Sequence, residues 1–174
     1  MSGDPRALVI PDGTEVIKTN QHRKANYEQV FIPKSVTEIK LGAFDSCKNL
    51  REVVFEEGSK LKIVGYNAFD ECESLAKINL PEGLQSIESA AFWNCNCLWH
   101  IQLPDGFEKI GTDCFYKSGL MEIILPESVK EVGPGAFSHC AQLKSAQMNE
   151  GLEKLGVKEV KYGVEREGEV FAYT

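Results

Sequence analysis

The sequence lacks any apolar run of the roughly 18 residues that a membrane-spanning helix needs, so we expect no membrane insertion. Its first residues contain no basic region followed by an apolar stretch, and no N-x-[ST] glycosylation sequon occurs. Both absences favour a cytoplasmic location, although a cell-surface or secreted location stays open if a signal sequence was removed. Positive charge is scarce, since 19 Lys and Arg face 26 Asp and Glu, and the resulting net charge of -7 disfavours nucleic-acid binding.

Sequence motifs for enzyme catalysis are also absent. The chain has no G-x-S-x-G, Walker loop, G-x-G-x-x-G or H-E-x-x-H. None of the histidines, His22, His100 and His139, belongs to a nucleophile motif, so we expect them to be solvated surface residues. Cys95 and Cys97 are too close in sequence for a zinc-ligand pair. The sequence therefore predicts no enzyme, no metal site and no cofactor.

What the sequence does contain is an internal repeat. A phenylalanine recurs every 22 to 25 residues, preceded by a small residue and followed three residues later by Cys or Ser. These pairs are Phe44 and Cys47, Phe69 and Cys72, Phe92 and Cys95, Phe115 and Ser118, and Phe137 and Cys140. An apolar pattern, L-x-x-I-x-L, follows each pair and is usually closed by proline, as in Leu98, Ile101, Leu103 and Pro104. The fourth unit is one residue short, because its Leu120 comes one position early.

This repeat resembles the BspA-like, or Treponema-type, leucine-rich repeat family, whose unit is similar to L-x-x-I-x-L-P-x-x-L-x-x-I-G-x-x-A-F-x-x-C. The match covers roughly residues 8 to 156, and INLPEGLQSIESAAFWNC departs from it only at Glu88, where the family usually has Gly. The resemblance implies a curved right-handed solenoid with a parallel sheet on its concave face. We therefore predict an α/β repeat solenoid: a curved leucine-rich-repeat array with short helical or irregular turns on the convex side.

We expect one domain over residues 1–174, in which each repeat forms one coil of the solenoid. About seven coils occupy residues 5–156, and residues 157–174 form a degenerate repeat or a cap. Each coil is predicted to have a strand at L-x-x-I-x-L and a second extended segment on the opposite wall, such as Leu84 to Ile87. Glycines such as Gly65, Gly111 and Gly133 suit tight turns with positive φ. Ala-Phe-x-x-Cys is expected to make one or two helical turns that bury the phenyl ring and the thiol, with the cysteines free.

The residues that the repeat does not fix are the candidates for binding. Alternation along the strands predicts that Val9, Phe31 and Val54 form an apolar ridge on the concave face. A large exposed aromatic such as Phe31 is either offered to a partner or covered by a terminal segment of the chain. The other candidate protein-binding residues are Trp99, His100 and Ile124 on the strands, and Trp93 and Tyr116 beside the repeated phenylalanines. The basic segment Lys18 to Asn26 is expected to be a solvated terminal loop.

These observations predict a non-enzymatic scaffold that binds another protein, of unknown identity, through the concave sheet and its rim. The alternative is a cell-surface or secreted adhesin, because BspA-like repeats also occur on such proteins. Both functions rest partly on fold-level analogy.

Overall fold

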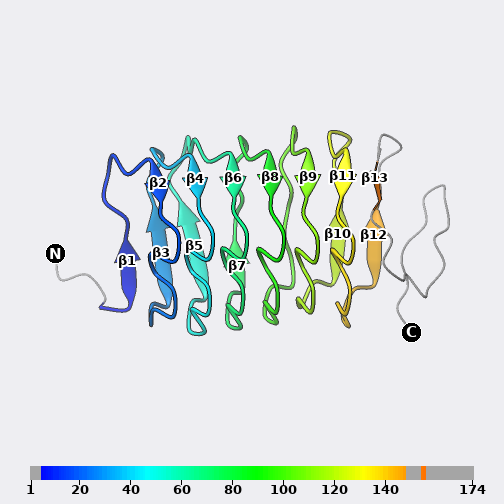
Figure 1. The fold of residues 1–174 in the computed structure, drawn as a ribbon, viewed down its shortest axis with the longest axis horizontal. Helices are drawn as coiled ribbons and strands as arrows, with labels where there is room; N and C mark the ends of the chain where they lie inside the picture. The colour runs from blue at the N-terminus through cyan, green and yellow to red at the C-terminus, as the bar shows by residue number, and fades with distance from the viewer. Residues whose placement is uncertain (1–4, 148–153, 156–174) are drawn as a thin grey trace.

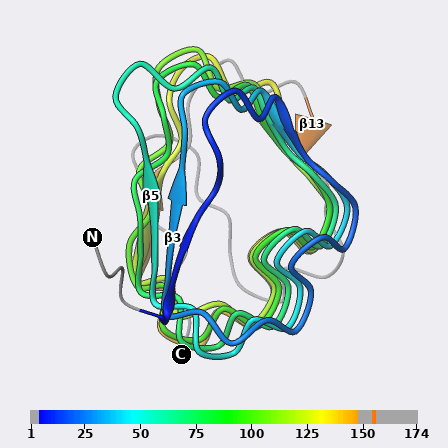
Figure 2. The same ribbon diagram turned by 90° about the vertical axis from the view of Figure 1, so that its left-hand side faces the viewer.

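In the computed structural model, the chain winds into coils whose parallel strands stack in two opposite walls (Figure 1). The structure describes residues 5–147 and the backbone of residues 154–155. The front wall, as we call the wall built from the L-x-x-I-x-L segments, contains β1 (Ala7–Val9), β3 (Gln29–Ile32), β5 (Glu52–Phe55) and β7 (Lys77–Ile78), paired in that order. Its remaining strands, β10 (Glu122–Ile124) and β12 (Ser145–Gln147), form a separate pair. Viewed along the stack, the coils superimpose closely on the side opposite β3 and β5, whereas the first coil takes a different course near β3 (Figure 2).

The back wall is one continuous seven-stranded parallel sheet. In chain order its strands are β2 (Val16–Ile17), β4 (Glu38–Ile39), β6 (Ile63–Val64), β8 (Ser86–Ile87), β9 (Lys109–Ile110), β11 (Glu131–Val132) and β13 (Lys154–Leu155). Equivalent repeat positions pair in register on both walls, as in Val9 with Phe31 and Phe31 with Val54. The parallel-strand solenoid predicted from the repeat is therefore confirmed, whereas its curvature and handedness stay predictions.

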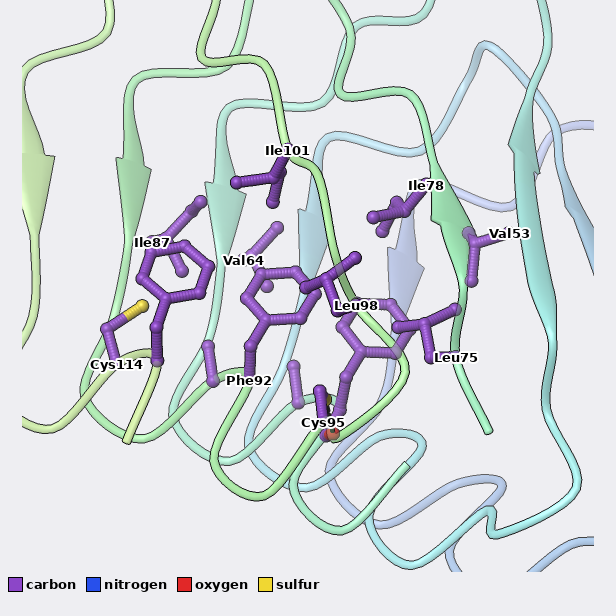
Figure 3. Packing of buried hydrophobic residues seen from close by; sticks show 14 of the residues in the cluster. Val53, Val64, Leu75, Ile78, Ile87, Phe92, Cys95, Leu98, Ile101 and Cys114 are labelled. Atoms are coloured by element: carbon purple, nitrogen blue, oxygen red, sulfur yellow. Dashed lines mark hydrogen bonds between the residues drawn. The ribbon is translucent and has the colours of Figure 1, made fainter. Parts of the chain in front are cut away.

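A ladder of stacked phenyl rings fills the core between the walls. The repeated phenylalanines lie 5.2 to 5.6 Å from their neighbours, centroid to centroid, with ring planes within 10° of parallel. Figure 3 shows Phe92 in this ladder, with Leu75 and Leu98 close by and Cys95 on the same coil. Because each ring packs on the coil before and the coil after, one substitution disturbs three coils at once.

The repeat cysteines are buried free thiols, as predicted, and each reaches back to the preceding coil. The Cys72 thiol donates to the Phe44 carbonyl at 3.2 Å, and the Cys95 thiol donates to the Phe69 carbonyl at the same distance. Cys47 and Cys140 make the equivalent bonds at 3.0 and 2.9 Å. Burial raises the pKa of these thiols, to about 11 for Cys47, so they stay protonated and able to donate.

The predicted helical turns are wrong, and with them the α/β class, because the described residues include no helix. Each coil instead carries two residues with positive φ around the phenylalanine, a conformation that cannot continue a right-handed helix. The first of the two precedes the phenylalanine by two positions and is usually Asn, Asp or Gly; these residues are Asn20, Gly42, Asn67, Ala90, Asp113 and Gly135. Asn, Asp and Gly tolerate this conformation best, so Ala90 is the strained member of the series.

The expectation that Gly65, Gly111 and Gly133 have positive φ is also wrong, because they lie outside the set of glycines with positive φ. Their backbones instead pass very close to the preceding coil. A Cβ added at Gly111 would lie 2.3 Å from the Ser89 nitrogen, and one added at Gly133 would lie 2.4 Å from the Thr112 nitrogen. Glycine is therefore required here for close approach between coils.

One predicted front-wall strand, Leu98 to Leu103, does not form. Within the described residues, the Ala76 carbonyl accepts no backbone hydrogen bond, although the equivalent Arg51 carbonyl accepts two. On the far side of this segment, the Gly119 N–H donates to the Cys95 carbonyl and the Met121 N–H to the Trp99 carbonyl. The front wall is therefore divided between β7 and the Leu98 to Leu103 segment.

His22 occupies the first position of the phenyl ladder, so its prediction as a solvated surface residue is wrong. Its imidazole stacks on Phe44 with centroids 5.4 Å apart and planes 12° from parallel, and its carbonyl accepts the Cys47 thiol. The surrounding basic segment is a regular coil, not a loop, because the backbone N–H groups of residues 20, 22 and 24 donate to the next coil. Burial lowers the pKa of His22, and its Nε2 is buried without a hydrogen-bond partner among the described residues.

We predict that Phe92→Ala lowers the free energy of unfolding by about 3 to 5 kcal/mol, the usual cost of deleting a buried phenyl group. Chemical denaturation followed by circular dichroism measures the change. Phe137→Ala, at the half-buried end of the ladder, is the matched control and should cost less. Equal losses for the two variants would show that the stack does not share its stability between neighbouring coils.

We predict that His22→Phe stabilises the protein, by about 1 kcal/mol from the added aromatic pair, and changes its response to acid. Since the folded state lowers the pKa of His22, the neutral ring is the stable form, and its contribution is complete above the unfolded pKa of 6.5 and lost as the pH falls below it. Thermal melts between pH 7.5 and 5 should therefore fall less steeply for His22→Phe than for the parent. Gln102→Phe, which adds a phenyl ring at an exposed position and removes no titratable group, is the control and should keep the parent slope.

Candidate binding surface

Exposed large apolar side chains gather in two patches on the front wall. Val9, which is 67% exposed, and Phe31, at 37%, lie on adjacent strands at the N-terminal end. Trp99 and Ile124, 59% and 60% exposed, lie on neighbouring coils in the C-terminal half together with exposed Met121. The remaining large apolar residues exposed in the described part of the chain are Leu41, Tyr66 and Ile63, outside the front wall.

The N-terminal patch, defined as Val9, Phe31 and Val54, surrounds a shallow hollow of about 250 Å³. The three side chains are in direct register on β1, β3 and β5. Val54 is half-buried, so it forms part of the wall of the hollow more than an exposed ridge. The hollow is also lined by Ile10, Asp12, Ile32, Pro33 and Glu56.

The C-terminal patch, defined as Trp99, Met121 and Ile124, lies beside the break in the front wall. His100 borders it, with its Nδ1 atom 3.7 Å from a carboxylate oxygen of Glu122. Met121 was missed by sequence reasoning because it occupies the second strand position, which is polar or small in several other repeats. Its alignment with Trp99, at the same repeat position one coil earlier, is the signal that identifies it.

A row of charged and polar side chains lies beside the N-terminal patch on β3 and β5 and continues to Lys77 on β7. Glu52 on β5 accepts a hydrogen bond from the Gln29 amide at 2.5 Å and lies 2.5 Å from the Lys77 ammonium. The hydrogen bond with Lys77 is the main cause that lowers the pKa of Glu52. The next outward residue on this part of the wall is Asn79, which is exposed. The apolar surface is therefore divided into two sites of different composition.

The structure does not bring Trp93 and Tyr116 together with the front-wall candidates. Both follow a repeated phenylalanine, and their rings stack on each other with centroids 5.6 Å apart. Tyr116 also meets the His139 ring edge-on at 4.9 Å, and the Lys117 ammonium is 5.5 Å from its centroid. Both aromatic residues are half-buried, so much of their apolar area already packs within this second column.

Asp70 lies in the same column, one coil before Trp93. Its Oδ2 atom accepts a hydrogen bond of 2.6 Å from the Asn67 amide, and its Oδ1 atom is buried without a partner among the described residues. Burial, with smaller contributions from Asp45 and Glu71, raises the pKa of Asp70 to about 6. Over residues 5–147, no group of three His, Cys, Asp or Glu side chains is arranged to hold a metal ion.

The repeat also matches a known family model. The model of the BspA type leucine-rich repeat region matches residues 62–161 in six copies. The chain belongs to this family. No curated protein matches it. In the part of the BspA-type chain that the structure describes, no helix is long and apolar enough to cross a membrane.

Solved structures share the fold. A leucine-rich repeat protein of Treponema pallidum is 34% identical with a TM-score of 0.67, over 74% of this chain and 69% of that one. A leucine-rich cell surface protein of Faecalibacterium prausnitzii is 26% identical with a TM-score of 0.58, and the match covers 83% of this chain and 48% of that one. The pneumococcal vaccine antigen PcpA, at 24% identity and a TM-score of 0.75, shows the fold alone, over 85% of this chain and 41% of PcpA. The chain thus spans less than half the length of the last two proteins.

The break beside the C-terminal patch should be visible in amide exchange. We predict that the amides of His100 to Leu103 exchange with solvent at least tenfold faster than those of Ile87 and Ile110, which lie in the continuous back wall. Hydrogen exchange followed by NMR or mass spectrometry measures the difference. Comparable protection in both segments would mean that the front wall is paired throughout.

Proposed function

We propose that the chain is a non-enzymatic interaction module that binds another protein through its front wall. The observation that carries this proposal is that five of the eight large apolar side chains exposed in the described residues lie on this wall. Single exposed apolar residues are ordinary on protein surfaces, whereas groups of them mark interaction sites. We propose a non-enzymatic role because the sequence contains no G-x-S-x-G, Walker loop, G-x-G-x-x-G or H-E-x-x-H motif.

The packing of the coils supports a rigid surface of this kind. The inward side chains of the front-wall segments, such as Ile78, Leu98 and Ile101, are buried in the core, so the backbone that carries the outward positions is held from behind. Binding to such a surface costs little conformational entropy, because the wall is already ordered before the partner binds. Trp99 is the strongest candidate anchor, because it is largely exposed and tryptophan is enriched among residues that dominate binding energy.

A second candidate function is the same kind of binding at the cell surface. The likeness to the F. prausnitzii protein, which is described as a cell surface protein, favours this location. The comparisons give no support to the cytoplasmic location expected from the sequence. Surface biotinylation of intact cells that express the full-length protein separates the two: labelling of the chain supports the surface location, and protection until lysis supports the cytoplasmic one.

We predict that Phe31→Ala and Trp99→Ala each weaken partner binding by about thirtyfold or more, the effect of losing an anchor worth about 2 kcal/mol. Proteins captured by the parent under native conditions are identified, and the affinity of each purified candidate is measured for every variant. Tyr66→Ala is the matched control, because Tyr66 is a comparably exposed aromatic outside the front wall. Thermal melts establish that each variant is folded.

A partner whose affinity changes less than twofold with both front-wall variants would contradict the proposal. A partner lost with Tyr66→Ala alone would move the binding surface to the turns around Leu41 and Tyr66. Each result therefore either supports the front wall as the recognition surface or contradicts it.

A further inference from the structure

The hollow in the N-terminal patch is large enough to hold one amino-acid side chain of a partner. Its volume of about 250 Å³ lies below the roughly 300 to 1,000 Å³ of typical small-molecule pockets, and it is open to solvent. Pockets of this kind at protein interfaces take single anchor side chains. The apolar lining from Val9, Phe31 and Val54 suits an aliphatic or aromatic group.

A departure from the repeat borders this hollow at Glu56. The third repeat has Glu56 after its strand β5, where the second has Pro33 after β3, and it contains two extra residues before Leu61. The resulting loop turns at Glu56 to Ser59, where the Ser59 N–H donates to the Glu56 carbonyl at 3.1 Å, and Figure 2 shows it projecting beyond the neighbouring coils. The outward positions that follow Val54 on the next coils are Asn79 and Gln102, so the apolar lining ends at the third coil.

Two carboxylates border the hollow, and they differ in how far they are neutralised. Glu56 accepts the Lys34 backbone N–H at 2.9 Å, and its other oxygen lies 3.2 Å from the Lys34 ammonium, so its charge is largely balanced. Asp12 is exposed in the Pro11–Gly13 tight turn and has no ion pair or side-chain hydrogen bond among the described residues. The unbalanced charge at the rim is therefore negative and is located at Asp12.

We propose that this hollow receives one bulky apolar side chain of a partner protein, with a Lys or Arg of the same partner segment placed against Asp12. This inference rests on the proposed function and specifies its chemistry at one of the two patches. The apolar group supplies most of the affinity through burial, and the cation fixes the orientation of the segment. At the C-terminal patch the nearby carboxylate, that of Glu122, lies 3.7 Å from the Nδ1 atom of His100.

The chain itself offers a matched control for Asp12. Pro104, Asp105 and Gly106 repeat the Pro11, Asp12 and Gly13 sequence four coils later. Both glycines have a φ of 82°, and both turns are closed by a backbone hydrogen bond to the proline carbonyl. Asp105 is exposed like Asp12 but borders no part of the hollow. Substituting either aspartate by Lys thus changes net charge equally in equivalent turns.

The experiment selects random linear dodecapeptides displayed on phage against the full-length protein and measures the affinity of the enriched peptides by fluorescence polarisation. We expect enriched sequences to pair Leu, Ile, Met or Phe with a nearby Lys or Arg. Asp12→Lys should weaken their binding at least tenfold and Val9→Asn at least fivefold, while Asp105→Lys stays within twofold of the parent. Val9 is largely exposed, so Val9→Asn is expected to fold.

Several results would overturn the inference. No enrichment, enriched peptides without the apolar and basic pair, or equal effects of Asp12→Lys and Asp105→Lys would each do so. Peptides that tolerate Asp12→Lys and Val9→Asn but are lost with Trp99→Ala would leave the front wall as the binding surface and remove only the hollow. Peptides insensitive to every front-wall variant would contradict the proposed function as well.

The occupant can also be tested directly in the full chain. A photo-crosslinking amino acid placed at position 9 should form no crosslink when the purified protein is irradiated alone, and should crosslink an enriched peptide when it is added. A crosslink within the same chain to residues 157–174 would show that the protein covers its own hollow. A crosslink to a second copy would assign the hollow to self-association, and either result would overturn the proposal.

Discussion

The repeated contact between each coil and the one before it is the constraint on which the rest of the structure depends. A phenyl ring packs on a phenyl ring, a thiol donates to a carbonyl, and a glycine lets two backbones approach, and each contact recurs between successive coils. A single coil of about 23 residues cannot bury its own apolar side, so its folding free energy comes from these interfaces. This explains why so many side-chain identities recur along the chain.

The same constraint decides what could be predicted from the sequence. Residues that face the neighbouring coil must match from repeat to repeat, and periodicity therefore identified the phenyl ladder, the buried thiols and the register of both walls. The turns could not be inferred in this way, because the conformation of the five-residue segment around each phenylalanine depends on backbone φ angles that several residue types tolerate. Asn67, Ala90 and Asp113 all have a positive φ at equivalent positions, although their residue types differ, so residue identity alone does not predict this conformation. The helical prediction failed at this step.

His22 shows a second limit of predicting structure from residue identity alone. It fills the ladder position of a phenylalanine, and Ala25 stands where later coils have Cys47 and Cys72. The stack requires a flat ring at this position, so the imidazole of His22 can form its first member, although one imidazole nitrogen is then buried without a hydrogen-bond partner among the described residues. Alignment by ring shape and spacing would have found this residue, whereas a search for the Ala-Phe-x-x-Cys motif could not. The candidate surface is less predictable still, since its residues are those that the stack leaves free.

The divided front wall bears on how the two patches are held relative to each other. The N-terminal patch lies on the paired strands β1, β3 and β5, whereas Ile124 of the C-terminal patch lies on β10, which pairs only with β12 on that wall. No ladder of front-wall hydrogen bonds joins the two groups of strands within the described residues. Their separation is instead set by the continuous back wall and by the phenyl ladder, which run past the break without interruption. A partner that contacts both patches therefore depends on the core behind the wall for its spacing, and a partner that contacts one patch depends only on the strands beneath it.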